Sequence, residues 1–334
     1  TTITIGGASA TTVINAGGAL SITAVDNLRA EALSPDQTYD LSTLAYPASI
    51  DAAVARNRLT GDTKIAVTSA AITQSGASKS AVLEANRKAI VIAEAKSSTL
   101  AGAVPNGSSV SLSGTYASNI LSGNVQATLS GGSLTAQSAT VTASDDATAI
   151  VKADLSAKTT TWVSTVNSSG MTIGATIAFN MIGSGNISAA QQTVDALLGT
   201  SITPSTASET KATLSGTSLN VTGDLSVLAD TAARVNSTIS NASESLVQGI
   251  TGSTGSAGGA IVASNLINSS TTANIRYTSA TSATVGGELR IAASDNAAIF
   301  SNAKLVTSST VTNDGGARLL QDTANLFVDY DYKS

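Results

Sequence analysis

Short stretches in which apolar and polar residues alternate recur along the whole chain. Alternation with a period of two is typical of strands that turn one face to a core and the other to solvent. The pattern is clearest in five stretches, at residues 1–5, 64–68, 109–113, 139–143 and 288–292. Strands are therefore the predicted building elements, and the predicted fold class is all-β.

The strand pattern is organised as a degenerate repeat, read most clearly at residues 127–150, 212–235 and 273–299. Each copy opens with a short alternating strand, turns, runs a second strand and closes on Asp or Asn beside alanines. Weaker copies end at residues 19–27 and run over 71–94. Units that cannot bury a core alone must stack on their neighbours, so the repeat predicts a parallel β-solenoid.

An Ala-x-Asn motif followed by an apolar residue gives the period of this repeat. It surrounds Asn119, Asn180 and Asn265, which are separated by 61 (180 − 119) and 85 (265 − 180) residues. Removing an insertion at about 187–210 restores the second spacing to 61, and we interpret a unit of this length as three solenoid coils of roughly 20 residues. The three asparagines are predicted to form an internal amide ladder at one corner, bonding between layers as in cross-β stacks.

The whole chain, residues 1–334, is predicted to form a single solenoid with two insertions. The first insertion spans about 34–62 and contains a possible helix over residues 50–58. Residues 80–96 are ambiguous because their propensities favour helix, but the repeat demands a strand from Lys88 onward.

The second insertion, at about 187–210, has clearer helix signals. Ser188 and Gln191 have the spacing of a capping box, and Val194, Leu197 and Leu198 then make one apolar face. Both insertions are predicted as short helical excursions on the flank of the solenoid. A binding protrusion is the alternative, because loops on a solenoid vary without disturbing the stack.

Composition supports narrow β layers. Only 12% of the residues are charged and 3% aromatic, whereas 42% are hydrophobic. The predicted core consists of Val, Ile, Leu and Ala stacked between coils, with Thr, Ser and Asn outside. The regular alternation argues against disorder. An array of β-sandwiches is the alternative fold, but it would show modules of about 100 residues with clear linkers.

The chain has no Cys and no His, and its formal net charge is -5. Thiolate metal sites, disulfides and a His-activated serine nucleophile are therefore excluded. The acidic balance argues against nucleic-acid or anionic-membrane partners, and no apolar run reaches the roughly 18 residues of a membrane span. We expect no enzymatic activity, and we expect the chain to be a processed or excised segment of something longer.

Aspartates recur near the ends of the repeat copies and are the only metal candidates. Asp145, Asp146, Asp230 and Asp295 would offer the oxygen ligands that Ca²⁺ prefers if they stacked at one corner. The favoured interpretation is that these residues cap turns through their own backbone. No other cofactor is expected.

Several repeat elements resemble a known group of proteins. These are the Ala-x-Asn-Ile motif at 117–120, the Ala-Thr-Leu-Ser-Gly-x-Ser motif at 127–133 and 212–218, and Ala-Ser-Asp at 143–145 and 293–295. They resemble the β-strand repeats of very large bacterial surface and secreted proteins, the filamentous-haemagglutinin-like adhesins. The resemblance covers residues 64–312 and, more weakly, the first 30 residues. It implies a right-handed β-solenoid that forms the stalk of an extracellular protein, and it brings no catalytic residues.

The expected function is a structural stalk or adhesive segment of a large protein at a bacterial surface, serving adhesion, aggregation or matrix formation. A self-assembling filament or sheath subunit is the alternative. A carbohydrate-active β-helix enzyme is disfavoured because aromatic platforms and His are lacking. The expected partners are copies of the chain or neighbouring repeats end to end, and a host or cell-surface glycan or protein.

Overall fold

The computed structural model describes residues 1–7, 11–35, 48–75, 79–103, 108–161, 168–183, 208–249, 252–277 and 282–313. These residues form β-strands and the turns that join them, and no helix occurs among them. The described residues accordingly contain no helix capable of spanning a membrane. Every strand pairs with its neighbours in parallel, at a constant register. The predicted all-β parallel solenoid is confirmed.

The chain makes five coils, each with outgoing strands, a short crossing strand and long returning strands, and the outgoing part of the first coil is only the four-residue β1 (Thr2–Ile5). The first coil contains β1 (Thr2–Ile5), β2 (Thr12–Ala16) and β3 (Leu20–Ser34). The second contains β4 (Ala48–Thr60), β5 (Thr63–Thr68), β6 (Ala70–Gln74) and β7 (Ser80–Ala103). The third contains β8 (Ser108–Ser122), β9 (Val125–Ser130), β10 (Ser133–Ala136) and β11 (Ser138–Thr161). The fourth contains β12 (Ser169–Gly183), β13 (Ser208–Ser215), β14 (Ser218–Val221) and β15 (Leu225–Gly249). The fifth contains β16 (Thr254–Arg276), β17 (Ala283–Val285), β18 (Leu289–Asp295) and β19 (Ala298–Asn313).

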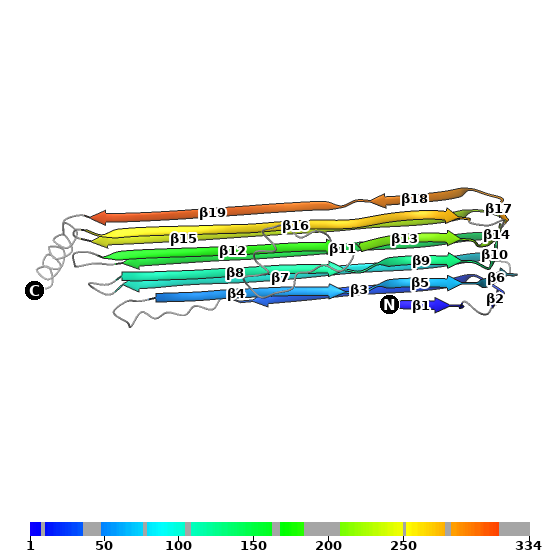
Figure 1. The fold of residues 1–334 in the computed structure, drawn as a ribbon, viewed down its shortest axis with the longest axis horizontal. Coiled ribbons are helices and arrows are strands. Elements are labelled where there is room, and N and C mark those ends of the chain that lie inside the picture. Colours follow the sequence, from blue (N-terminus) through cyan, green and yellow to red (C-terminus); the bar gives the residue numbers. More distant parts are fainter. Residues whose placement is uncertain are drawn as a thin grey trace, which may run out of the picture.

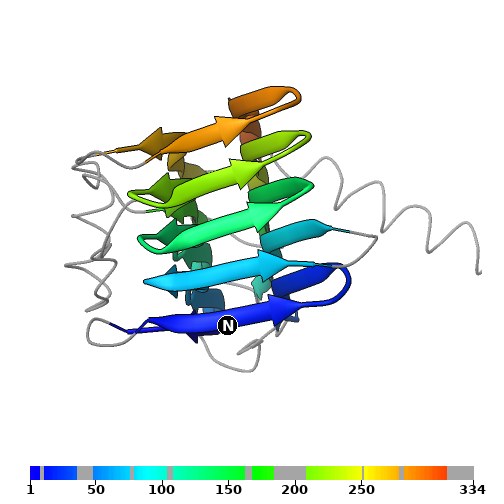
Figure 2. The same cartoon turned by 90° about the vertical axis from the view of Figure 1, so that its right-hand side faces the viewer.

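Stacking of the coils produces three sheets (Figure 1). The outgoing sheet has the order β1-β5-β9-β13-β16-β12-β8-β4, and the returning sheet has β3-β7-β11-β15-β18 with β19 also on β15. The short end sheet, β17-β14-β10-β6-β2, joins them at one end. Figure 2 looks onto the end sheet: the chain crosses it from left to right while climbing from the first coil to the last, so the solenoid is right-handed.

The outgoing sheet consists of two halves placed end to end. The proximal half, next to the end sheet, contains β1, β5, β9, β13 and residues 269–276 of β16. The distal half contains β4, β8, β12 and residues 254–268 of β16. Strand β16 runs through both halves without a break, whereas the second, third and fourth coils are interrupted between them.

The 61-residue unit is one coil, so the interpretation as three coils of roughly 20 residues is wrong. Thr63 pairs with Val125 in the next coil (125 − 63 = 62), and Asn119 pairs with Asn180 (180 − 119 = 61). A single coil consumes this many residues because β7 and β11 have 24 residues each and β15 has 25. Globular proteins rarely use strands of this length, since roughly 5–6 residues is the usual value.

The predicted repeat copies do lie in register. Ala127, Ala212 and Ala273, which open the three clearest copies, are direct partners in neighbouring strands. The spacing of 85 between Asn180 and Asn265 also has the expected cause, because 24 residues, 184–207, separate Gly183 at the end of β12 from Ser208 at the start of β13. The helix predicted in that insertion lies outside the described residues.

The possible helix over residues 50–58 is wrong. Residues 48–60 form β4, which pairs with β8 along its whole length, from Ala48 and Val110 to Thr60 and Ser122. The first insertion is thus mostly a regular part of the second coil, and its residues 36–47 lie outside the described ranges. Strand β7 also extends over Ser80–Ala103, including the part before Lys88 whose propensities favour helix. Pairing with β3 and β11 on both sides overrides the local preference.

The predicted core is largest next to the end sheet. There, inward-facing Ile65, Leu129 and Leu214 lie in one fully buried cluster with Leu83 and Val141 of the returning sheet. The turn into β10 relies on Gly131 and Gly132, whose φ angles of 68° and 69° are accessible to glycine. Polar side chains cover the outside of this half, as the alternation predicted.

The interior of the distal half is mixed. Near the boundary, Leu121 and Ile182 pack with Val91 and Val235 in a buried cluster, and a smaller cluster of alanines with Val151 and Ile239 follows, so the predicted core continues there. Farther from the end sheet, Ser, Thr and Gly take more of the inward positions. Thr159 and Thr172 are joined across the interior by a hydroxyl hydrogen bond of 2.8 Å, and Thr99 and Ser111 by one of 2.5 Å. A Cβ placed on Gly174 would lie 2.5 Å from Oγ of Ser243 in the returning sheet. At Gly174 the two sheets therefore approach too closely for an added side-chain atom.

Candidate functional site

Four asparagines stack inside the distal half, one in each of the upper four coils. Nδ2 of Asn57 donates to Oδ1 of Asn119 at 3.0 Å, Asn119 donates to Asn180 at 3.1 Å, and Asn180 donates to Asn265 at 3.1 Å. The four residues lie within β4, β8, β12 and β16, not at a corner of the coil. They form a continuous amide ladder along the solenoid axis.

The asparagine ladder also joins the two broad sheets. The amide nitrogens of Asn57, Asn119 and Asn180 donate to backbone carbonyls of the returning sheet, at Ile92, Ile150 and Asn236. An unpaired buried amide would cost about 1–3 kcal/mol, so this pairing stabilises the polar interior. Asn57 was missed in the sequence because Arg58 follows it, where the other three motifs have an apolar residue. A looser Ala-x-Asn motif would have found it.

A buried ion pair lies at the boundary between the two halves. Nε of Arg87 donates to Oδ1 of Asp145 at 2.8 Å, and Nη2 donates to Oδ2 at 2.6 Å. Both side chains are almost completely buried, with 1% and 2% of their surface exposed. Nη1 of Arg87 also donates to the carbonyl of Gly61, in the link between β4 and β5. This bidentate arrangement satisfies both carboxylate oxygens of Asp145.

The ion pair belongs to a polar row that crosses all five coils. Asp26, Arg87, Asp145, Thr231 and Asp295 are successive partners in the returning sheet. One cation thus lies between two carboxylates in the lower coils, and the Thr231 hydroxyl takes the next position. The row contains two of the aspartates that the sequence singled out, together with an arginine that the repeat pattern did not indicate.

The four predicted calcium ligands are not brought together. The Asp145 carboxylate is paired with Arg87. Asp146, the next residue in β11, faces the opposite side of the sheet. Asp230 faces outward from β15, and Asp295 accepts a hydrogen bond of 2.8 Å from Ser269. Within the described part of the chain, no three acidic side chains gather into a possible metal site. The turn-capping interpretation is also wrong for Asp145, Asp146 and Asp230, which lie inside long strands.

Two carboxylates near the boundary have lowered pKa values. Burial alone would raise the pKa of Asp62, but hydrogen bonds from Lys64 and from the backbone N–H of Asn124, together with the charges of Lys64 and Arg87, bring it below its ordinary value. Burial likewise opposes the lowering of the Asp26 pKa, which follows from hydrogen bonds donated by Thr1 and Thr63. Both groups are therefore held as carboxylates, in structural contacts.

The outer faces of the two broad sheets differ sharply in polarity. The returning sheet carries charged side chains, among them Glu94. The ammonium groups of Lys96 and Lys152 lie 3.3 and 3.6 Å from the Glu94 carboxylate. The distal half of the outgoing sheet carries an apolar strip instead. It consists of Ile50, Val54, Val110, Leu112, Tyr116, Ile120, Met171, Ile173, Ile177, Phe179, Met181, Val262 and Leu266.

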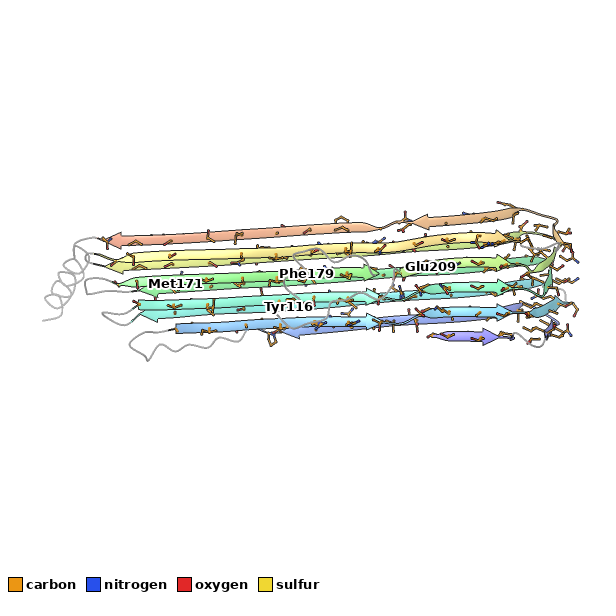
Figure 3. All side chains as sticks on the ribbon, viewed as in Figure 1. Tyr116, Met171, Phe179 and Glu209 are labelled. Atoms are coloured by element: carbon orange, nitrogen blue, oxygen red, sulfur yellow. The ribbon has the colours of Figure 1, made fainter. Side chains whose placement is uncertain are left out.

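Figure 3 shows Tyr116, Phe179 and Met171 of the apolar strip on neighbouring strands, whereas Glu209 lies in the proximal half. The rings of Tyr116 and Phe179 meet edge to face, with centroids 6.2 Å apart. Period-two alternation predicted which residues share a face, but it did not predict that the apolar face would lie outside.

The part of the strip around Ile50, Leu112 and Ile173 is the feature best suited to contact a partner, because it is apolar, outward-facing and exposed. The ladder and the ion pair have their polar groups satisfied within the chain. A comparison with models of known protein families matched none of them, and comparisons with curated proteins and with solved structures likewise found no match.

Proposed function

We propose that the chain is a structural rod, serving as a stalk or adhesive segment of a large extracellular protein at a bacterial surface. The observation that carries this proposal is the continuity of the inward-facing rows. The row through Ile22, Leu83, Val141, Val227 and Ile291 crosses all five coils without a break in register. Such a stack forms a stiff rod that can be lengthened, because each coil contacts only its neighbours and the unit can be repeated.

Electron microscopy of the purified chain in negative stain, with and without Ca²⁺, tests this proposal. We expect short single rods of uniform width in both conditions. Globular particles, or rods that collapse at moderate salt, would contradict a stalk. Binding of the rods to glycan arrays or cell-surface proteins would then separate an adhesive segment from a passive one.

A subunit that assembles end to end is the second candidate, and the last coil favours it. Among the described residues no coil lies above its inward-facing apolar side chains, which are between 38% and 51% exposed: Leu289, Ile291, Ile299, Leu305 and Val311. Exposed core rows of this kind can be covered by another coil of the same geometry.

Head-to-tail stacking in register would place Asp295 of one copy beside Asp26 of the next, since both belong to the same polar row. Adjacent carboxylates repel unless a proton or a cation lies between them. Fibres should therefore grow faster with Ca²⁺, and Ile291→Lys should prevent them. Fibres that form equally well without Ca²⁺ would contradict this register.

A further inference from the structure

The exposed end of the apolar strip extends across successive coils. Ile50, Leu112 and Ile173 are direct partners in β4, β8 and β12, and 54%, 43% and 42% of their surfaces are exposed. Val54 and Met171 flank this row and are 61% and 41% exposed. Together these five side chains expose on the order of 400 Å² of contiguous apolar surface, a size that often marks an interaction site.

Charge is absent from most of this surface. The outward positions of β8, β12 and residues 254–268 of β16 carry no Asp, Glu, Lys or Arg, and β4 contributes only Arg56 and Arg58. The outer face of the returning sheet, by contrast, carries Glu84, Lys88, Glu94, Lys96, Asp146, Lys152, Asp154 and Lys158 on β7 and β11 alone. Depletion of charge at the centre of a patch is the compositional signal of a protein interface.

The apolar residues of the strip cannot exchange places with the small polar residues that face inward on the same strands. The sheets of the distal half are held close by hydroxyl contacts such as Thr159 to Thr172, and Gly174 has no room for a Cβ beside Ser243 and Leu155. Toward the end of β12 the strip is already covered within the chain, because Tyr116, Phe179 and Met181 are 5%, 2% and 1% exposed. The uncovered part is therefore the end defined by Ile50, Leu112 and Ile173.

The chemistry of this surface fits a second copy of the same chain. Two copies laid face to face about a twofold axis would place the same uncharged patch against itself, as an isologous interface does. A charged partner would instead lose the hydration of its charges against apolar side chains. Seven residues along four coils give a contact of roughly 23 by 19 Å, or about 400 Å² per copy, which is below the 1,200 Å² in total that stable interfaces bury.

We propose that the exposed end of the apolar strip is a self-association surface, through which two copies pair weakly, sheet on sheet. The small area predicts a dimer that forms only at high protein concentration. This pairing is lateral, and it does not rest on the proposed stalk function or on end-to-end stacking.

Analytical ultracentrifugation between about 5 µM and 1 mM tests the pairing, since weak interfaces dissociate in this range. We expect a concentration-dependent monomer–dimer equilibrium, and Leu112→Lys should raise its dissociation constant at least roughly tenfold by burying an unpaired charge. Leu100→Lys is the matched control, because Leu100 is 51% exposed on the returning sheet. It should leave the equilibrium unchanged.

Cysteine cross-linking gives an independent measurement, because the chain contains no Cys. Ile173→Cys should form a disulfide-linked dimer on mild oxidation, and Leu100→Cys should not. A chain that stays monomeric at 1 mM would overturn the proposal, as would equal effects of the two lysine variants or equal cross-linking of the two cysteine variants. Far-ultraviolet circular dichroism of each variant establishes that it is folded, and Ile173→Lys replaces Leu112→Lys if the latter fails to fold.

Discussion

The two halves of the outgoing sheet have opposite polarity. In the proximal half, Leu129 points into a large apolar cluster, and polar side chains such as Gln126 face solvent. In the distal half of the same coil, Ser111 and Ser113 point inward, whereas Leu112 faces outward and is 43% exposed. Both halves alternate with a period of two, so the same local pattern serves two different interiors.

The difference shows that the distal half relies on polar contacts inside it as well as on apolar burial. Its middle strands β8 and β12 are paired on both sides through their backbones, and its interior adds the asparagine ladder and the hydroxyl contacts. The proximal half has the same backbone pairing and the larger hydrophobic core. Removing inward-facing groups should accordingly have different effects in the two halves and at the boundary between them.

The largest effect is expected at the boundary, from Asp145→Ala. The change leaves Arg87 buried and without its carboxylate, which typically costs about 3–5 kcal/mol. Urea denaturation followed by circular dichroism measures the loss of unfolding free energy. Asp146→Ala is the control, because its side chain faces the other side of β11, and it should change stability by less than about 0.5 kcal/mol. Similar losses for both variants would show that the buried ion pair does not contribute to stability.

The next effect sharpens the contrast within one coil. Leu129→Ala removes a fully buried side chain from the proximal core and should cost about 2–5 kcal/mol. Leu112→Ala truncates an exposed leucine in the distal half and should cost less than about 1 kcal/mol. The difference in denaturation midpoint between the two variants measures how much more the inward face of the proximal half contributes to stability than the outward face of the distal half. A larger loss for Leu112→Ala would mean that the outer face is the true core.

Close approach of the sheets in the distal half can be tested with Gly174→Ala. The new Cβ would lie 2.5 Å from Oγ of Ser243 and 2.7 Å from Cδ2 of Leu155, so we expect a loss of about 1–3 kcal/mol from overpacking. At Gly114 on the outer face, a Cβ would meet nothing within 4 Å. Gly114→Ala should therefore be neutral or slightly stabilising, and equal thermal midpoints for the two variants would argue against a narrow interior.

The smallest effect concerns pH at the boundary. The Asp62 pKa is lowered on folding, so this carboxylate adds stability above its unfolded value of about 3.9, and that stability is lost as the pH falls through the folded pKa. Because the side chain is partly exposed, the contribution should be below about 1 kcal/mol. Asp62→Asn should lower stability at pH 7 and converge with the unmodified chain near pH 2. Unchanged stability at pH 7 would contradict the role of Lys64 and Asn124.

Much of the architecture could be predicted from local sequence, and the length of a coil could not. Alternation and the repeat identified the strands, and the Ala-x-Asn spacing identified both the period and the 24-residue interruption. The number of coils per period failed because roughly 20 residues is a usual solenoid coil, whereas β7 and β11 have 24 residues each and β15 has 25. The aspartates misled in another way, because Asp145, Asp146 and Asp230 resemble turn residues. Inside the fold, Asp145 is matched by Arg87, which lies 58 residues away and is visible only when the coils are stacked.

By itself, the sequence determined that the chain would alternate, repeat and stack, because period-two patterning and self-similarity are local properties of the residue order. Which face of each strand turned inward was decided only in the tertiary structure. Leu129 and Leu112 occupy similar patterns, yet one is buried and the other exposed, because the facing strands offer leucines and valines near the end sheet and hydroxyls farther along. The choice of core face depends on what lies across the solenoid, and that partner is supplied by residues distant in the chain.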